Sequence, residues 1–195
     1  RYLDAELEYM PWSAVLKNMK YLDLMLRRDV NEYKDLKSYL IEKLTNFFEN
    51  QGFESLEDDE FMDIIARRLA VEWMCKYDFP DCIQPANEAF ESWMMADDSD
   101  EENPIDVDLR PYIYETAMRT GNETHWRFLR EVSENATVET ERKTLLTSLA
   151  KTTNEDLLLE LLNSTIDSES GIRRQDCVYI YRAIGDEMIG SGVMF

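Results

Sequence analysis

The chain has 195 residues, and 44% of them are hydrophobic, a composition typical of a folded domain with one core or a short array of repeats. Its formal net charge is −20, from 41 acidic and 21 basic residues, and this field repels phosphate backbones, which argues against nucleic-acid binding. Such an acidic surface favours solubility, although it could also attract basic peptides. The apolar runs are only a few residues long, so we expect no direct membrane insertion.

The apolar residues recur with a period near 3.6, and the 6 glycines and 5 prolines interrupt this pattern rarely. We therefore predict an all-helical protein, with a hint of strand-like alternation only at 177–182. In chain order, the expected helices cover about 12–27, 30–50, 56–75, 79–96, 107–120, 123–133, 138–151, 154–166 and 172–186.

Turn residues mark several of these helix ends. Asp29 is placed to cap the second helix, while Gly52 and Gly121 are placed to end helices. Glu139 and Glu141 put acidic side chains in a first helical turn, where the helix dipole favours them.

Helices of this length, joined by short turns and lacking a heptad seam, favour an α-solenoid of antiparallel helix pairs of the HEAT or armadillo type. The repeats align only loosely, so the periodicity alone does not establish a solenoid. The segment 96–108, ADDSDEENPIDVD, predicts an exposed acidic loop. It lacks the spacing of a calcium-binding loop, and no pair such as Glu101 and Glu102 stands out as acid and base.

Cys75 and Cys82 lie seven positions apart, between two helical patterns. A disulfide there would stabilise the fold by about 2–2.5 kcal/mol in the chain-entropy model, and reduced core cysteines are the alternative. Cys177 lies in the apolar run CVYIYRAI, and we expect it to be a free, buried thiol.

Residues for catalysis are scarce. The chain has no HExxH motif, and no Ser/His/Asp or Cys/His arrangement can be built around His125, its one histidine. We expect His125 on the exposed side of a helix start, without a ligand role. The chain alone is therefore expected to be inactive and to hold neither a metal nor another cofactor.

Four segments follow one another in a recognisable order, namely YLDAELEYMPWSAVLKNMKYLDLML, ARRLAVEWMCKYDFPDCIQPANEAFESWM, IDVDLRPYIYETAMRTGNETHWRFL and GIRRQDCVYIYRAI. Together they resemble the carboxy-terminal helical domain of gluzincin aminopeptidases, a zinc-dependent family that includes aminopeptidase N, aminopeptidase A and the endoplasmic reticulum aminopeptidases. The resemblance covers nearly the whole chain. It implies a curved stack of helix pairs and a bridge between Cys75 and Cys82.

The resemblance also implies a supporting, non-catalytic role in a larger enzyme that removes amino-terminal residues from peptides. In that family the zinc lies in a catalytic domain of the same polypeptide, and the carboxy-terminal helices form a bowl over the substrate chamber. We therefore expect residues 1–195 to be part of such a domain, truncated at both ends of the parent. The catalytic domain and a peptide substrate are the expected partners.

Arg173 and Arg174 are the first candidates for peptide contact, because a cation at a helix start does not serve the helix dipole. A guanidinium there could bind a carboxylate in a bidentate fork, or it could form an ordinary ion pair with Asp176 or Glu169.

Glu8, Tyr9 and Tyr114 are further candidates for peptide contact. A solvated helix face is the alternative for Glu8, and core packing is the alternative for the tyrosines. The remaining large side chains at helical spacing are assigned to packing, namely Trp12, Trp73, Trp93, Trp126, Phe90, Met74 and Met94.

The chain departs from the family at two places. Glu115 and Lys151 align with a second pair of cysteines found in many members, so we expect these two opposite charges to meet. The family also continues beyond the IRxQD helix with further helix pairs. We therefore expect residues 180–195 to fray, to aggregate or to support a homodimer.

Sequons for N-glycosylation at Asn122, Asn135 and Asn163 fit an extracellular, cell-surface or secretory-pathway location. The rival hypothesis is a stand-alone helical-repeat scaffold that binds a protein partner on its concave face. Unmodified asparagines and reduced cysteines would favour the rival.

Overall fold

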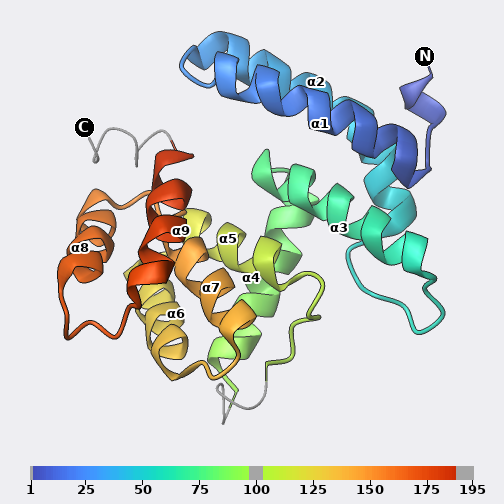
Figure 1. Ribbon diagram of the computed structural model, residues 1–195. Coiled ribbons are helices and arrows are strands. Elements are labelled where there is room, and N and C mark those ends of the chain that lie inside the picture. Colours follow the sequence, from blue (N-terminus) through green and yellow to red (C-terminus); the bar gives the residue numbers. More distant parts are fainter. Residues whose placement is uncertain (1, 97–102, 188–195) are drawn as a thin grey trace. The chain divides into compact units, whose positions relative to one another are not determined.

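The computed structural model describes residues 2–96 and 103–187, and within them it contains nine α-helices, one short 3-10 helix and no strand (Figure 1). The all-helical class is confirmed, and the hint of alternation at 177–182 lies inside a helix. The elements are η1 (Leu3–Ala5), α1 (Tyr9–Leu26), α2 (Val30–Gln51), α3 (Phe61–Lys76), α4 (Pro80–Met94), α5 (Arg110–Thr120), α6 (Glu123–Asn135), α7 (Glu139–Leu149), α8 (Glu155–Ile166) and α9 (Arg174–Gly185).

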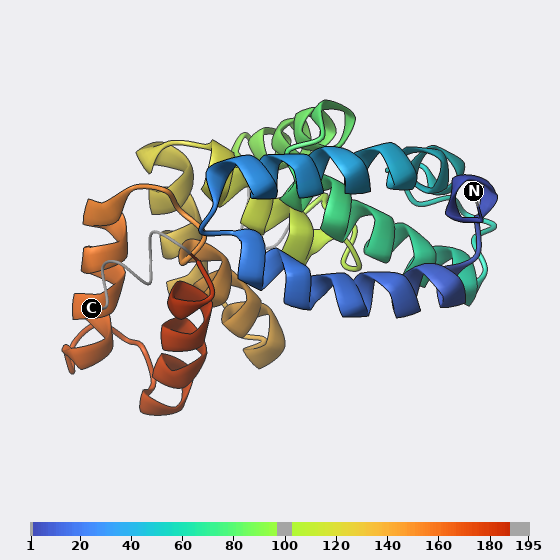
Figure 2. The ribbon, with the colours of Figure 1, turned by 90° about the horizontal axis from the view of Figure 1, so that it is seen from above.

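The chain divides into two compact units, residues 1–85 and residues 86–195, and the division falls within α4. In the first unit, α1 and α2 lie side by side and run antiparallel, as both views show (Figures 1 and 2). Such pairs are compatible with a solenoid, whose arrangement over the whole chain stays a prediction. Residues 97–102 of the acidic segment, which include Glu101 and Glu102, lie outside the described residues. Residues 188–195 lie outside them as well.

The core of the first unit is built from apolar faces of α1, α2 and α3. Trp12 of α1 is fully buried and stacks on Phe47 of α2, with ring centroids 5.6 Å apart. Val71 and Met74 of α3 are also fully buried. The period of 3.6 that predicts these helices therefore also identifies the faces that they bury.

Helix α3 begins later than the expected start at residue 56, because local polar contacts hold the preceding residues in a turn. The Asp59 carboxylate accepts a hydrogen bond from the Leu56 amide at 2.8 Å and forms a buried ion pair with Arg67. Glu60 and Asp63 then form a reciprocal capping box at the helix start. The acidic run therefore caps the helix instead of extending it.

A disulfide joins Cys75, near the end of α3, to Cys82, near the start of α4, with Cα atoms 5.1 Å apart. This confirms the bridge. Between the two helices, Asp78 has φ of 63°, and the Phe79 amide donates to the Met74 carbonyl at 3.0 Å. Cys177, in the second unit, is free and buried as expected.

The core of the second unit contains an aromatic cluster. Phe90 and Trp93 of α4 are buried and meet edge to face, and Tyr114 of α5 stacks on Trp93 with centroids 5.1 Å apart. On α6, Trp126 is buried and donates from Nε1 to the Leu149 carbonyl of α7 at 3.2 Å. The tryptophans, Phe90 and Met74 are thus core residues as expected, whereas Met94 is only half-buried.

The three turn residues expected at helix ends are found there. Asp29 accepts hydrogen bonds from the Asn31 and Glu32 amides at 3.0 and 3.1 Å. Gly52 ends α2 with φ of 68°, a left-handed conformation that favours glycine. Gly121 ends α5, although its backbone is extended.

Lys151, which follows α7, lies among acidic side chains. Burial opposes its charged form, but the charges of Glu115 and Glu187 outweigh burial and raise the pKa of Lys151. Its Nζ lies 2.7 Å from Glu187 Oε1. Glu115 therefore acts on Lys151 electrostatically, whereas Glu187 supplies a direct ion pair that the alignment did not predict. Direct contact between Glu115 and Lys151 stays a prediction.

Candidate functional site

A cleft of about 50 Å³ opens in the second unit, between α6, α7 and the segment that leads into α9. Two guanidinium groups, two hydroxyls, one carboxylate and an apolar wall line it. The lining residues are Arg130, Ser133, Glu134, Arg142, Leu146, Ser170, Gly171 and Ile172.

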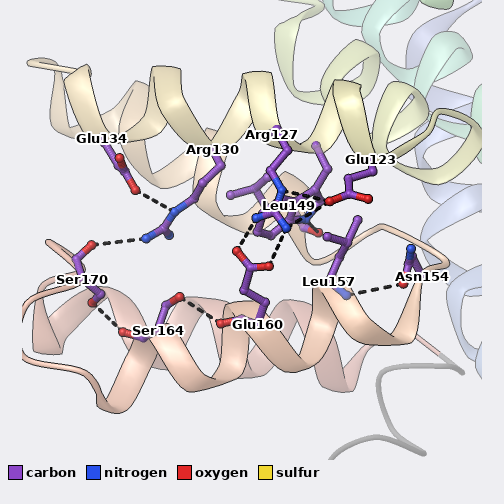
Figure 3. Close-up of polar contacts among 11 residues, drawn as sticks. Glu123, Arg127, Arg130, Glu134, Leu149, Asn154, Leu157, Glu160, Ser164 and Ser170 are labelled. Carbon is purple, nitrogen blue, oxygen red and sulfur yellow. Dashed lines mark hydrogen bonds and ion pairs between the residues drawn. The ribbon is translucent and has the colours of Figure 1, made fainter.

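Arg130 is the central polar residue of this cleft. It follows the buried Trp126 by four residues on α6, so it lies at the border of the apolar face. Its Nε donates to Glu134 Oε1 at 2.9 Å, and its Nη2 donates to the Ser170 carbonyl at 3.2 Å (Figure 3). Its Nη1 is buried and has no hydrogen-bond partner among residues 2–96 and 103–187.

The segment between α8 and α9 is held in shape by its own hydrogen bonds. The Ser170 Oγ lies 2.5 Å from the Ser164 carbonyl oxygen (Figure 3). It also lies 2.8 Å from the Asp167 carbonyl oxygen, so the two acceptors share its one proton. Gly171 then turns the chain with φ of 74°, a backbone conformation that residues other than glycine rarely adopt. These contacts fix the Ser170 carbonyl against Arg130.

Arg142 of α7 supplies the second guanidinium. Its Nη2 lies 3.0 Å from Oδ2 of Asp176, a buried residue of α9. The cleft therefore contains two cations, and each is already paired with one carboxylate. Arg130 forms an ion pair with Glu134, and Arg142 forms one with Asp176. Sequence reasoning missed both arginines, and the position of Arg130 beside an apolar helix face was the one available signal.

Arg173 and Arg174 lie at the start of α9, next to the segment that lines the cleft. Arg173 forms an ordinary exposed ion pair, but its partner is Glu139 of α7 and neither Asp176 nor Glu169. Arg174 is exposed, and no ion pair holds it within the described part of the chain. The structure thus places both predicted arginines beside the cleft without making either part of its lining.

Tyr114 is fully buried, so it cannot touch a peptide in this conformation. Its hydroxyl donates to Glu141 Oε1 at 2.7 Å and accepts from Asn103 Nδ2 at 2.6 Å. Burial and the bond to Glu141 raise its pKa. Tyr114 is therefore a core residue with a bonded hydroxyl. Glu8 is exposed and Tyr9 is half-buried, both at the start of α1 in the first unit.

The three sequon asparagines are exposed. Asn122 caps α6, where its Oδ1 accepts a hydrogen bond from the Thr124 amide at 2.8 Å. Asn135 is the last residue of α6, and Asn163 lies within α8.

The surroundings of His125 do not suit zinc. His125 was expected to be exposed, but its side chain is only 16% exposed, because its ring stacks on Phe90 at 5.8 Å. Its Nε2 lies 3.9 Å from a single carboxylate, that of Glu91. No group of three or more potential ligands for a metal ion occurs in the described residues.

None of the helices that the structure describes combines the length and the apolar character needed to cross a bilayer.

Comparison with known proteins gives the family. Residues 1–193 match the ERAP1-like C-terminal domain family. The chain is 30% identical over 200 residues to aminopeptidase N of Oryctolagus cuniculus and 29% identical over 198 residues to aminopeptidase N of Homo sapiens; each alignment covers 100% of this chain and 20% of the relative. It is also 28% identical to aminopeptidase A of Gloydius brevicauda, over 98% of this chain and 19% of the relative. The chain therefore spans about a fifth of the length of these relatives, and it belongs to the ERAP1-like C-terminal domain family.

Proposed function

We propose that this chain is the non-catalytic helical domain of a larger zinc aminopeptidase, in which it closes the substrate chamber and supports the catalytic domain of the same polypeptide. The match of residues 1–193 to the family carries this proposal. The names of the relatives supply the reaction, the removal of amino-terminal residues from peptides. In this proposal the zinc lies in the catalytic domain of the same polypeptide.

The start of α9 is the part of this domain that we propose contacts the peptide. Arg174 is exposed without an ion pair inside the described ranges, so its guanidinium is available to a carboxylate. Arg173 is paired with Glu139, but both side chains are about half exposed, at 52% and 49%. Such a surface pair contributes only about 0–1 kcal/mol, so a substrate carboxylate can replace Glu139 at little cost.

The test is a kinetic comparison in the polypeptide that contains the catalytic domain. The Arg174→Gln variant should raise KM for a peptide of several residues and leave an aminoacyl anilide unaffected, because in this proposal only the longer substrate extends to α9. Arg182→Gln is the matched control, since Arg182 is exposed on the same helix and its loss changes the net charge equally. Equal effects of the two variants, or no effect on the longer substrate, would contradict peptide contact at Arg174.

The proposed location is extracellular, at the cell surface or in the secretory pathway. The disulfide supports this location, because such bonds persist in oxidising compartments. Mass spectrometry of the native protein, before and after enzymatic removal of N-glycans, should show a mass loss at one or more of Asn122, Asn135 and Asn163. Unmodified asparagines together with reduced cysteines would favour a stand-alone cytosolic scaffold.

A further inference from the structure

Arg130 carries a donor that no acceptor in the described part of the chain uses. A guanidinium has five N–H donors in a planar fork. The Nε and Nη2 of Arg130 are bonded to Glu134 and Ser170, whereas its Nη1 is buried without an acceptor among the described residues. Native proteins rarely leave a buried charged donor without an acceptor, because the group has lost its hydration. The position therefore calls for an oxygen atom that the described residues do not supply.

The cleft has the size and the lining for a small group that carries such an oxygen. Its volume of about 50 Å³ exceeds what one water molecule needs, which is about 10–15 Å³ on the same kind of measure. Arg142, whose side chain is only 13% exposed, adds a second guanidinium to the lining. Leu146 and Ile172 form an apolar wall. Cations and an apolar wall together fit a carboxylate that bears a short apolar substituent.

The charges around the cleft restrict the ligand further. Each arginine already has a carboxylate partner, Glu134 for Arg130 and Asp176 for Arg142, so the cleft has no large excess of positive charge. The chain as a whole carries a net charge of −20. A divalent anion such as sulfate would therefore be repelled more strongly than a monovalent one.

We propose that the cleft lined by Arg130 and Arg142 binds a monovalent carboxylate group, with Nη1 of Arg130 as the donor that the fold leaves for it. The group can belong to a free short-chain acid or to the end of a peptide chain, since both present the same chemistry. This site is separate from the exposed Arg174, and it does not depend on the proposed role in an aminopeptidase.

The test uses acetate as the probe and acetamide as its neutral counterpart of similar shape. Binding is followed by saturation-transfer NMR and by thermal unfolding, with sodium chloride holding the ionic strength constant. The protein should bind acetate saturably, should unfold at a higher temperature in its presence, and should ignore acetamide. No saturable binding of acetate, or equal responses to acetate and acetamide, would overturn the proposal and leave a cleft that holds only water.

Variants locate the site. Arg130→Gln should weaken acetate binding by about tenfold or more, because the charged donor is lost. Arg127→Gln is the control, since Arg127 lies about one turn earlier on α6 and pairs with Glu123 and Glu160 outside the cleft (Figure 3). If both variants weaken binding equally, acetate binds elsewhere and the proposal fails.

Two further measurements complete the test. Should Arg130→Gln fail to fold, Arg130→Lys keeps the charge but lacks the planar fork, and it should also bind acetate less tightly than the native protein.

A short peptide is compared with its carboxy-terminal amide to separate the two sources of the group. Tighter binding of the free acid than of the amide places a chain end in the cleft. Binding of acetate with no binding of either peptide restricts the site to small acids. Equal binding of the two peptides at Arg130 would contradict carboxylate recognition.

Discussion

The Asp23→Asn substitution tests how the first unit is held together. Asp23 of α1 is only 1% exposed, yet its carboxylate accepts hydrogen bonds from four side chains. Lys76 Nζ lies at 2.8 Å, the Tyr33 and Tyr77 hydroxyls lie at 3.0 and 3.2 Å, and Arg27 forms an ion pair with it. The substitution preserves the volume of the side chain but removes its negative charge.

The expected loss of stability follows from which contacts survive. The asparagine Oδ1 can still accept from the two tyrosine hydroxyls, whereas its amide group would face the cations of Arg27 and Lys76 as a second donor. Breaking a buried ion pair by removing one partner costs about 3–5 kcal/mol. Lys76 keeps 32% of its side chain exposed and can recover some hydration, so we expect a loss of about 3 kcal/mol, at the lower end of this range.

Urea unfolding measures this loss, and hydrogen exchange shows where it occurs. Because two compact units can unfold separately, the free energy of opening is read from amides of α1, α2 and α3. Asp35→Asn on α2 is the matched control, since Asp35 is exposed and its substitution should change stability by less than about 0.5 kcal/mol. If Asp23→Asn costs no more than the control, the network does not stabilise the unit and our reasoning is wrong.

Three other perturbations have defined outcomes. Reduction of the Cys75–Cys82 bridge should lower the free energy of unfolding by about 2–2.5 kcal/mol, and an unchanged urea midpoint under reductant would contradict this. Although burial opposes its ionisation, bonds from the neighbouring cations hold the pKa of Asp23 below its ordinary value of 3.8. The stabilisation by ionised Asp23 should therefore be complete above about pH 4 and should be lost as the pH falls through the pKa of Asp23 in the folded protein. An acid transition, followed by circular dichroism, that is the same in the native protein and in Asp23→Asn would refute this. Tyr114→Phe should cost about 1–3 kcal/mol in thermal unfolding, because the Glu141 carboxylate loses a buried donor, and a gain in stability would show that this bond is not needed.

The helices were predictable because each one carries its own local signals. On α6, Trp126, Leu129 and Val132 recur at helical spacing, and all three are buried. Asp29 caps α2 through contacts only two and three residues away. The start of α3 was placed too early, because an acidic segment compatible with a helix is held in a turn by the more distant Arg67.

The candidate site was less predictable, because it depends on pairings between distant residues. Arg142 meets Asp176, and Arg173 meets Glu139, each across 34 positions of sequence. Neither pairing follows from helical periodicity, since both require α7 and α9 to pack with a particular register. The position of Arg130 beside an apolar face was visible in the sequence, but the presence of a cleft there was not.

The most direct test of the central claim is to sequence the transcript upstream of the codon for Arg1. Our account predicts that the reading frame continues and encodes an HExxH motif with a further glutamate downstream of it, which together form the zinc site of the catalytic domain that this helical domain would cover. A start codon close to Arg1, with no such motif in frame, would contradict the account and would identify the chain as an independent helical module.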